Sequence, residues 1–503
     1  MSNNIAVLIA AASKNNDFML LNPEITFFRT VTLKKHKSYI FNDGYTITHS
    51  QINIQFDKPL KFGQTSTCHI NNNFDLLNGL TLYVQLPIFN EILDNDGNTM
   101  NIYFKWINYI KYFMINEVSL IIGNTEIVKY TGEYMYIHDL LFNKCEVDKN
   151  VYSKNNNTID HHVMLNFFFR EDLNNPSLPL FALKNNDIKI CINIRNLSQC
   201  YHITPTHYIE CLDVFVLFTK YDDIYQDVNG KRIFGIFSHY DPTTNYLYYT
   251  NINGTFVSDN VIYTYSNNYY TATPKSTSVI YVSYTLISNI ENMNIRNSYI
   301  IADYTTGLSK TLKSEISKKK ILYLIEQVYR TANVTINGNY KKFQIVSNNL
   351  CKSIYFLTQC NYIYNSNYLN IYNYTHVDNE KYQRIDLDNY LIEGINISLN
   401  NQKQYENFDP NFFNIIDVMS KYKSSIHPGI FVYTPCLYPT KMPSGSLNSS
   451  IIKTIEIELY MNNSIINEIS NGANVGYANA RGYATTYNFL EIQNGEIKLL
   501  FSK

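Results

Sequence analysis

The chain has 503 residues and a mass of 58.7 kDa, which is more than one hydrophobic core usually organises, so two or more domains are expected. Its net charge of −1 excludes an overall field that would attract nucleic acid or anionic lipid, and no stretch is long and apolar enough to predict a membrane-spanning helix. Tyrosine (45 residues) and phenylalanine (28 residues) both favour strands, so the composition indicates strands joined by polar turns.

The N-terminal residues 1–24 are expected to form an arm in front of the first domain. Pro23 restrains Asn22 to extended geometry, so a helix in the arm should end there. The apolar run at residues 5–12 follows no basic leader and is much too short to span a membrane. Residues 25–33 are rich in aromatic and β-branched side chains and predict the first strand.

Strand signals recur along the first 300 residues. Residues 80–87 and 188–194 alternate between apolar and polar side chains, which is typical of half-buried strands. The dipeptide at 123–124, Gly-Asn, predicts a hairpin turn. Residues 225–298 break this rhythm with many Tyr, Asn, Thr and Ser residues, and could form a separate domain or an insertion between two strands. The strand pattern at 299–304 favours the insertion.

A lysine-rich stretch at residues 311–320 is expected to be a linker or a short helix, and strand patterns resume at 323–328, 353–358 and 395–400. The eight cysteines have no Cys-x-x-Cys spacing, which in a chain of this length favours reduced, buried thiols and a cytosolic compartment.

One turn organises the C-terminal part of the chain. Pro443 fixes its own φ angle, Gly445 supplies a conformation that other residues resist, and Ser444 and Asn448 can bond the local backbone. Residues 451–459 then alternate, so a strand is expected in which the two glutamates face away from the apolar side chains.

Five motifs, in the correct order along the chain, resemble the major capsid proteins of nucleocytoplasmic large DNA viruses. They are NPEITFF at 22–28, YTGEY at 130–134, YLIEQV at 323–328, GIFVY at 429–433 leading to PSGSLNSS at 443–450, and YNFLEI at 487–492 before a glycine. Besides the turn, the positions that carry the resemblance are Asn22, Pro23, Phe27, Phe28, Tyr323, Leu324, Ile325, Glu326, Gln327, Tyr487, Asn488 and Gly495.

The resemblance implies an all-β fold of two tandem eight-stranded antiparallel jelly-roll sandwiches, a double jelly roll. The first sandwich would occupy residues 25–310, with a long loop insertion at about 225–298. The linker at 311–320 would lead to the second sandwich at 321–503.

The resemblance also implies a structural virion protein, in which homotrimers form pseudo-hexagonal capsomers that tile an icosahedral shell. Such capsomers would contact neighbouring capsomers and minor capsid proteins and would assemble in the host cytoplasm. The 1–24 arm could reach an internal virion membrane. Neither a cofactor nor a catalytic residue is implied. Departures from the family pattern around the turn leave open a divergent paralogue, minor or penton-like, or a membrane-shaping scaffold of the same fold.

Other functions have weaker support from the residues themselves. No Gly-x-Ser-x-Gly, phosphate-binding glycine loop or His-Glu-x-x-His motif is present, so no enzyme class is indicated. Four potential metal ligands lie within twelve positions, but their spacing fits no common zinc module, which favours buried cysteines and satisfied histidines: Cys200, His202, His207 and Cys211.

The basic runs at 34–37 and 318–320 favour solvated faces over nucleic-acid contacts. A carbohydrate-binding β-sandwich remains a distant alternative. It would need paired carboxylates or an aromatic cleft with acidic partners, and the sequence pattern offers only Glu456 and Glu458.

Overall fold

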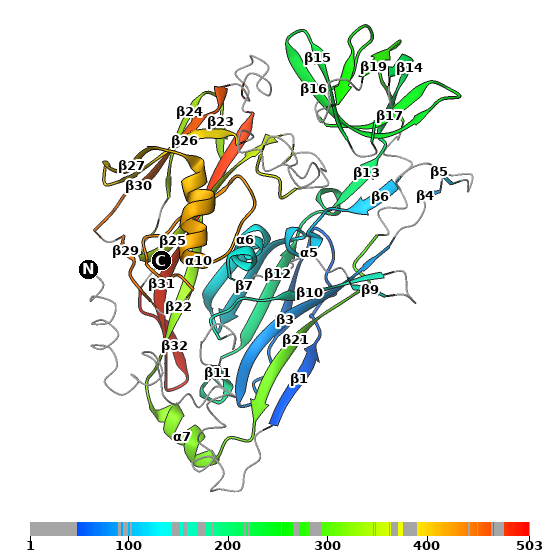
Figure 1. Ribbon diagram of the computed structural model, residues 1–503. Coiled ribbons are helices and arrows are strands. Elements are labelled where there is room, and N and C mark those ends of the chain that lie inside the picture. Colours follow the sequence, from blue (N-terminus) through cyan, green and yellow to red (C-terminus); the bar gives the residue numbers. More distant parts are fainter. Residues whose placement is uncertain are drawn as a thin grey trace.

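The structure is a computed structural model that shows two β-sandwiches side by side and a smaller sheet domain at one end (Figure 1). It describes residues 48–501 apart from 89–91, 94–98, 101–102, 143–150, 154–157, 170–176, 184–185, 216–217, 220–221, 253, 265–270, 282–292, 346, 348, 362, 364–370, 376–389, 441–442, 450, 464–465 and 467–476. The expected arm at 1–24, the strand at 25–33 and the motif residues Asn22, Pro23, Phe27 and Phe28 lie outside the described residues.

The first sandwich has two facing sheets, each built around four antiparallel strands. One sheet has the order β1 (Thr48–Ile54), β21 (Asn297–Thr306), β3 (Leu76–Pro87), β10 (Thr158–Met164), with β9 (Val151–Ser153) beyond β10 and β11 (Leu178–Pro179) beside β3. The other has the order β2 (Thr65–His69), β12 (Ile188–Ile194), β7 (Ile115–Ile122), β8 (Thr125–Thr131).

The second sandwich repeats this arrangement. One sheet has the order β22 (Ile321–Arg330), β31 (Ala478–Gln493), β25 (Leu350–Cys360), β28 (Ile430–Tyr433), extended by β23 (Val334–Ile336), β29 (Leu447–Asn448) and β32 (Glu496–Leu499). The other has the order β24 (Tyr340–Ile345), β30 (Ile455–Met461), β26 (Ile392–Leu399), β27 (Gln402–Phe408). In both sandwiches the eight main strands, numbered along the chain, lie in the orders 1-8-3-6 and 2-7-4-5, so the expected double jelly roll is confirmed.

Local sequence explains these strands. In β12 the four isoleucines are buried while Lys189, Cys191 and Asn193 are partly exposed, as the period-two pattern predicted. Gly123 has a φ of +60° in the two-residue turn that joins β7 to β8, a conformation that glycine adopts without steric cost.

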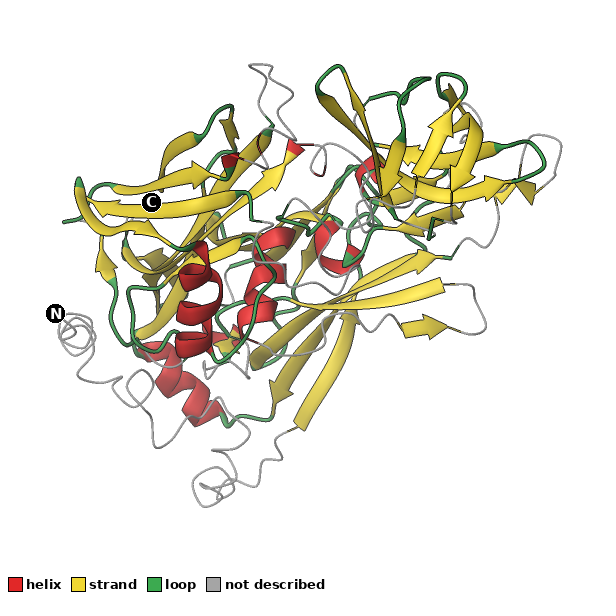
Figure 2. Ribbon diagram, turned by 45° about the horizontal axis from the view of Figure 1, so that its top comes forward, coloured by secondary structure: helices red, strands yellow, loops and turns green. Residues whose placement is uncertain are grey.

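The helices also occupy equivalent positions. The helix α6 (Gly132–Phe142) follows the fifth strand of the first sandwich, and η6 (Phe412–Ile416) with α10 (Asp417–Tyr422) follows the fifth strand of the second. The two sandwiches are joined by α7 (Lys310–Lys318), which begins where the Ser309 hydroxyl accepts a hydrogen bond from the Leu312 N–H. Figure 2 shows α6 and α10 side by side in the middle of the molecule, between the two sandwiches, and α7 at the end away from the small sheet domain. Among the described residues, no helix combines the length and apolar character needed to cross a membrane.

The small sheet domain is an insertion between the seventh and eighth strands of the first sandwich. A short ladder of β6 (Tyr103–Trp106) and β13 (Tyr201–Thr204) leads into it. Its sheet has the order β17 (Tyr246–Asn251), β16 (Lys231–Asp241), β15 (Asp223–Val228), β18 (Ile262–Thr264), β19 (Thr271–Pro274), β14 (His207–Phe215), β20 (Val279–Ile280). Because β14 also pairs with β17, the six strands from β17 to β14 close into a ring.

This insertion has its own core and begins earlier than the sequence suggested. Its buried core includes Ile209, Leu247 and Phe256, separate from the cores of the sandwiches. The expected start at residue 225 is wrong, because β14 at His207–Phe215 already belongs to the insertion sheet. The richness in Tyr, Asn, Thr and Ser that marked the insertion begins only after β14. Because the residues of β14 are typical of any strand, composition placed the start of the insertion too late.

Candidate functional site: the buried junction between the two sandwiches

The junction between the sandwiches is a continuous core and not a flexible contact. The apolar cluster that fills the first sandwich continues into side chains of the second, including Tyr323, Tyr355, Leu357 and Tyr483. On β25, Tyr355 and Leu357 face this junction while Ile354 and Phe356 belong to the core of the second sandwich. The sheet of β22, β31, β25 and β28 is therefore covered on both faces.

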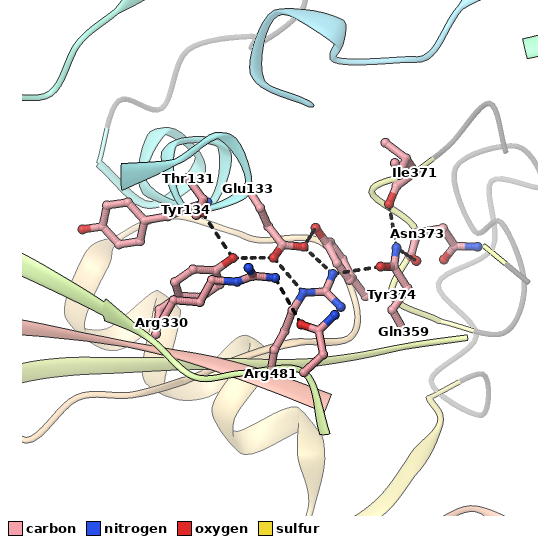
Figure 3. A network of polar contacts seen from close by, with 11 residues as sticks. Thr131, Glu133, Tyr134, Arg330, Gln359, Ile371, Asn373, Tyr374 and Arg481 are labelled. Atoms are coloured by element: carbon pink, nitrogen blue, oxygen red, sulfur yellow. Dashed lines mark hydrogen bonds and ion pairs between the residues drawn. The ribbon is translucent and has the colours of Figure 1, made fainter. Parts of the chain in front are cut away.

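A buried ion pair lies at the centre of the junction (Figure 3). Glu133, near the start of α6, is 5% exposed, and Arg481, on β31, is 2% exposed. The guanidinium donates two hydrogen bonds to the carboxylate, from Nε to Oε2 at 2.8 Å and from Nη2 to Oε1 at 2.5 Å. This two-point contact joins the first sandwich to the second with fixed geometry.

Tyrosine hydroxyls complete the shell around Glu133. Tyr374 donates to Oε1 at 2.9 Å and Tyr483 donates to Oε2 at 2.5 Å, so both oxygens have two donors. Arg481 also donates to Oε1 of Gln359 at 2.8 Å, and the Gln359 amide in turn donates to the backbone carbonyl of Ile371 at 2.6 Å. Hydrogen bonds to both charged groups offset part of the free-energy cost of removing the pair from water.

The electrostatics of the site hold Glu133 in its charged form. Burial by itself raises the pKa of this carboxyl, but the Arg481 guanidinium and the Tyr483 hydroxyl outweigh burial and lower the pKa to about 2. Burial raises the pKa of Tyr374 and Tyr483 above the ordinary value, so both phenols stay protonated and act as donors. Such an arrangement locks two domains together.

The motif YLIEQV contributes two more contacts across the junction. The hydroxyl of Tyr323 donates to the backbone carbonyl of Ser177 at 2.9 Å, and the Gln327 amide donates to the carbonyl of Ile127 at 2.7 Å. Both acceptors belong to the first sandwich. Between them, the Ile325 side chain is fully buried in the shared core.

The C-terminal motif supports these contacts. Asn488 donates to Oε1 of Gln327 at 2.8 Å and exchanges hydrogen bonds with the backbone of Phe501. The carbonyl of Gly495 accepts a hydrogen bond from the side chain of Asn186, again across the two sandwiches. Gly495 has a φ of +83° in the turn between β31 and β32, which explains a glycine at this position.

The remaining motif residues face away from the first sandwich. Leu324 and Tyr487 pack in a separate apolar cluster, and Glu326 forms an ion pair with the buried amine of Lys352. The YLIEQV motif therefore alternates: Tyr323, Ile325 and Gln327 face the junction, while Leu324 and Glu326 point to the other face of the strand.

The turn at Pro443 leads into β29, which pairs with β25. Gly445 has a φ of +125°, in agreement with the expectation that a special conformation is needed there. The Ser444 hydroxyl accepts from the Tyr438 N–H at 2.7 Å, and Asn448 is paired with Leu350 in the ladder.

The strand after this turn starts later than predicted. The carbonyl of Asn448 accepts from the N–H groups of both Ile451 and Ile452, which extends the turn and leaves Ile451 70% exposed. The strand β30 begins at Ile455. Glu456, which was expected to face solvent, is covered, because Lys342 and Gln344 on β24 lie over its carboxylate.

The four potential metal ligands do not share one core. Cys200 is buried in the core of the sandwiches, while Cys211 is buried in the core of the insertion. In the described part of the chain, no group of three or more His, Cys, Asp and Glu side chains is arranged to hold a metal ion.

Sequence reasoning missed the ion pair itself. Glu133 lies within the YTGEY motif, but the motif carries no sign that its carboxylate is buried. Arg481 stands in a stretch, residues 478–486, that was not predicted as a strand. A useful signal would have been the two carboxylates, Glu133 and Asp139, in a helix whose other residues are mostly apolar and buried.

Two family models match the chain. Residues 28–227 match the major capsid protein N-terminus, and residues 313–497 match the large eukaryotic DNA virus major capsid protein. Probable capsid protein 4 of Acanthamoeba polyphaga mimivirus is 28% identical, with 94% of each chain covered. The major capsid protein of Phaeocystis pouchetii virus is 21% identical, with 98% of each chain covered.

Solved structures show the same fold. The PBCV-1 virus capsid chain superposes with a TM-score of 0.58 at 16% identity, covering 91% of this chain and 98% of that chain. The Faustovirus major capsid protein superposes with a TM-score of 0.57 at 10% identity, covering 92% and 94%. With both sandwiches matched by family models and the strand order repeated in each, the chain belongs to the major capsid protein family of large eukaryotic DNA viruses and is a structural component of the virion capsid.

Proposed function

We propose that three copies of this chain form a pseudo-hexagonal capsomer that tiles an icosahedral shell. The observation that carries the proposal is the repetition of one eight-stranded topology in two sandwiches. A ring of three such chains has six similar blocks around its axis. The buried Glu133–Arg481 contact supports it further, because a block pair with fixed geometry presents a fixed lateral surface.

Native mass tests the trimer directly. Light scattering of the purified protein is expected to give about 176 kDa, three times the mass of the 58.7 kDa chain. Negative-stain images should show six-lobed particles. A stable monomer at low micromolar concentration would contradict the proposal.

The orientation of the capsomer forms a second part of this proposal. The insertion lies at one end of the molecule and α7 lies at the opposite end (Figure 1). A long insertion is tolerated where it crosses no packed sheet or lateral contact, so we place it on the outer surface. The α7 end then faces inward, and we propose that the arm at 1–24 also acts there, towards minor capsid proteins and an internal virion membrane.

Limited proteolysis of assembled particles tests this orientation. Cleavage is expected first within the insertion, at residues 207–281, while the arm at 1–24 stays protected. Early cleavage of the arm with an intact insertion would reverse the orientation. The family assignment would stand in either case.

A divergent capsid paralogue is the second candidate. It is favoured by the relatives from a single mimivirus, which carry the different names Probable capsid protein 4 and Capsid protein 1. Quantitative mass spectrometry of purified virions separates the two roles. A major capsid protein is expected to be the most abundant shell component, whereas a penton-like or scaffold paralogue would be present in few copies or absent. In either role the protein acts by assembly, in the host cytoplasm, without an enzymatic step.

A further inference from the structure

One face of the insertion sheet carries a row of aromatic side chains. The strand registers place Val279 opposite Tyr208, Tyr208 opposite Tyr248, and Tyr248 opposite His239, across β20, β14, β17 and β16. Ile209 on β14 and Leu247 and Tyr249 on β17, which alternate with these residues, are buried in the insertion core. Since alternate residues of a strand point to opposite faces, the aromatic row lies on the outer face.

The rings of this row form a connected surface. The His239 and Tyr248 rings are stacked, with centroids 4.4 Å apart and planes at 11°. Tyr208 lies 5.9 Å from Tyr248 and 4.9 Å from Tyr246, and Tyr281 stands edge-on to Tyr248 at 5.0 Å. All five rings are half-buried, so each supports its neighbours and keeps part of its surface accessible to solvent.

Carboxylates flank the rings on the same face. Glu210 lies opposite Tyr246 on one side and Asp241 lies opposite Tyr246 on the other, two residues along the strands from the aromatic row. Glu210 forms a 2.6 Å ion pair with Lys275. Asp241 is oriented by hydrogen bonds from the hydroxyls of Thr243 and Thr244, at 2.6 and 2.9 Å.

We propose that this aromatic platform, formed by Tyr208, Tyr246, Tyr248, Tyr281 and His239, binds a neutral saccharide. A pyranose ring has a C–H face that packs on aromatic rings, and its hydroxyls can donate to carboxylates. Two carboxylates, of which only Glu210 is paired with a lysine, disfavour an anionic occupant such as nucleic acid or an acidic lipid surface. The platform and its two carboxylates together form an aromatic surface with acidic partners. A carbohydrate-binding protein needs such a surface, and the sequence pattern alone did not reveal it.

Binding is tested on the full-length protein with soluble probes. Titration calorimetry and saturation-transfer NMR would use tetrasaccharides of N-acetylglucosamine, glucose and mannose, with a heparin tetrasaccharide and a thymidine octanucleotide as anionic probes. We expect at least one neutral tetrasaccharide to bind with millimolar affinity or better. The double variant Tyr208→Ala/Tyr248→Ala should weaken that binding about tenfold or more.

Two further variants keep the test decisive. Tyr263→Ala removes a ring of the same insertion that stacks on Tyr225 outside the platform, and it should leave saccharide binding unchanged. Asp241→Asn changes no ring, so it still tests the platform if the double variant does not fold. We expect this variant to bind the saccharide severalfold more weakly.

Two binding results would overturn the proposal: no neutral tetrasaccharide binds, or an anionic probe binds in its place. A change in native mass of the double variant would also overturn it, because it would show that a second copy of the chain covers the platform. The native mass of the wild-type protein tests the capsomer separately, so the two proposals can fail independently.

Discussion

The two sandwiches share one strand order but bury their equivalent sheets differently. In the first sandwich, β21 mostly alternates between buried and half-buried residues, because only one face of this strand packs on a core. In the second, β31 is buried along most of its sixteen residues, since its other face packs on the first sandwich. Polar residues in β31, such as Arg481 and Asn488, are buried at or beside this second contact. The difference locates the junction within an otherwise repeated fold.

The connection between the seventh and eighth strands differs as well. In the first sandwich it runs through residues 195–296 and contains a sheet with its own core. In the second it is confined to residues 462–477. The insertion is not isolated from the second sandwich, because Ile236 belongs to the core cluster of that sandwich. An insertion at one repeat can therefore extend the molecule at one end while it stays attached to both repeats.

The largest effect is expected from breaking the junction. Glu133→Ala leaves the Arg481 guanidinium buried without its carboxylate, and the free energy of unfolding should fall by about 3–5 kcal/mol. Urea denaturation of the purified protein measures this loss. The control is Lys403→Ala, which removes an exposed ion pair with Glu406 and should leave the free energy of unfolding nearly unchanged. If the free energy of unfolding of Glu133→Ala fell no more than that of the control, the junction pair would not be important for stability.

The same ion pair predicts an acid limit. The folded-state pKa of Glu133 is lowered from 4.5 to about 2, so its stabilising contribution is present above pH 4.5 and is lost as the pH falls towards 2. The double variant Glu133→Leu/Arg481→Met removes this contribution. Its free energy of unfolding should therefore decline less than that of the wild type over this range, as measured by urea denaturation at successive pH values. A parallel decline would contradict the assignment.

A glycine at the junction should matter more than one in open space. Gly429 has a φ of +86°, and a Cβ there would lie 2.2 Å from the carbonyl oxygen of Tyr374, which is itself part of the Glu133 shell. Gly429→Ala is expected to destabilise the protein by about 3 kcal/mol or more, because backbone must move. Gly338→Ala is the matched control, since no atom lies within 4 Å of its Cβ position. Thermal melting compares the two variants.

The turn at Gly445 should show an intermediate effect. Its φ of +125° is strained for other residues, but the nearest atom to a Cβ would be 3.7 Å away. Gly445→Val should therefore cost about 1–3 kcal/mol through backbone strain alone. A melting temperature of Gly445→Val equal to that of the wild type would show that the turn is an ordinary one.

The sequence allowed the fold to be predicted further than the site. Alternating strands such as β12 are visible in sequence because one face is buried and the other is not. The buried faces of β31 gave no such alternation, so the contacts of Arg481 were not foreseen. The start of the insertion was misplaced because β14 resembles any other strand. Side-chain contacts across the two repeats depend on packing between segments hundreds of residues apart, which no local pattern encodes.

The smallest effect should come from the edge of the junction, at Tyr323. Tyr323→Phe keeps the ring in the shared core but removes the hydroxyl that donates to the Ser177 carbonyl, which leaves a buried acceptor without its donor. The expected cost is about 1–2 kcal/mol in the free energy of unfolding. Tyr340→Phe, on the 47% exposed Tyr340 of β24, should be nearly neutral by the same measurement. If both changes were neutral, the junction would depend on its apolar contacts and its ion pair, and the tyrosine of the YLIEQV motif would serve only to fill space.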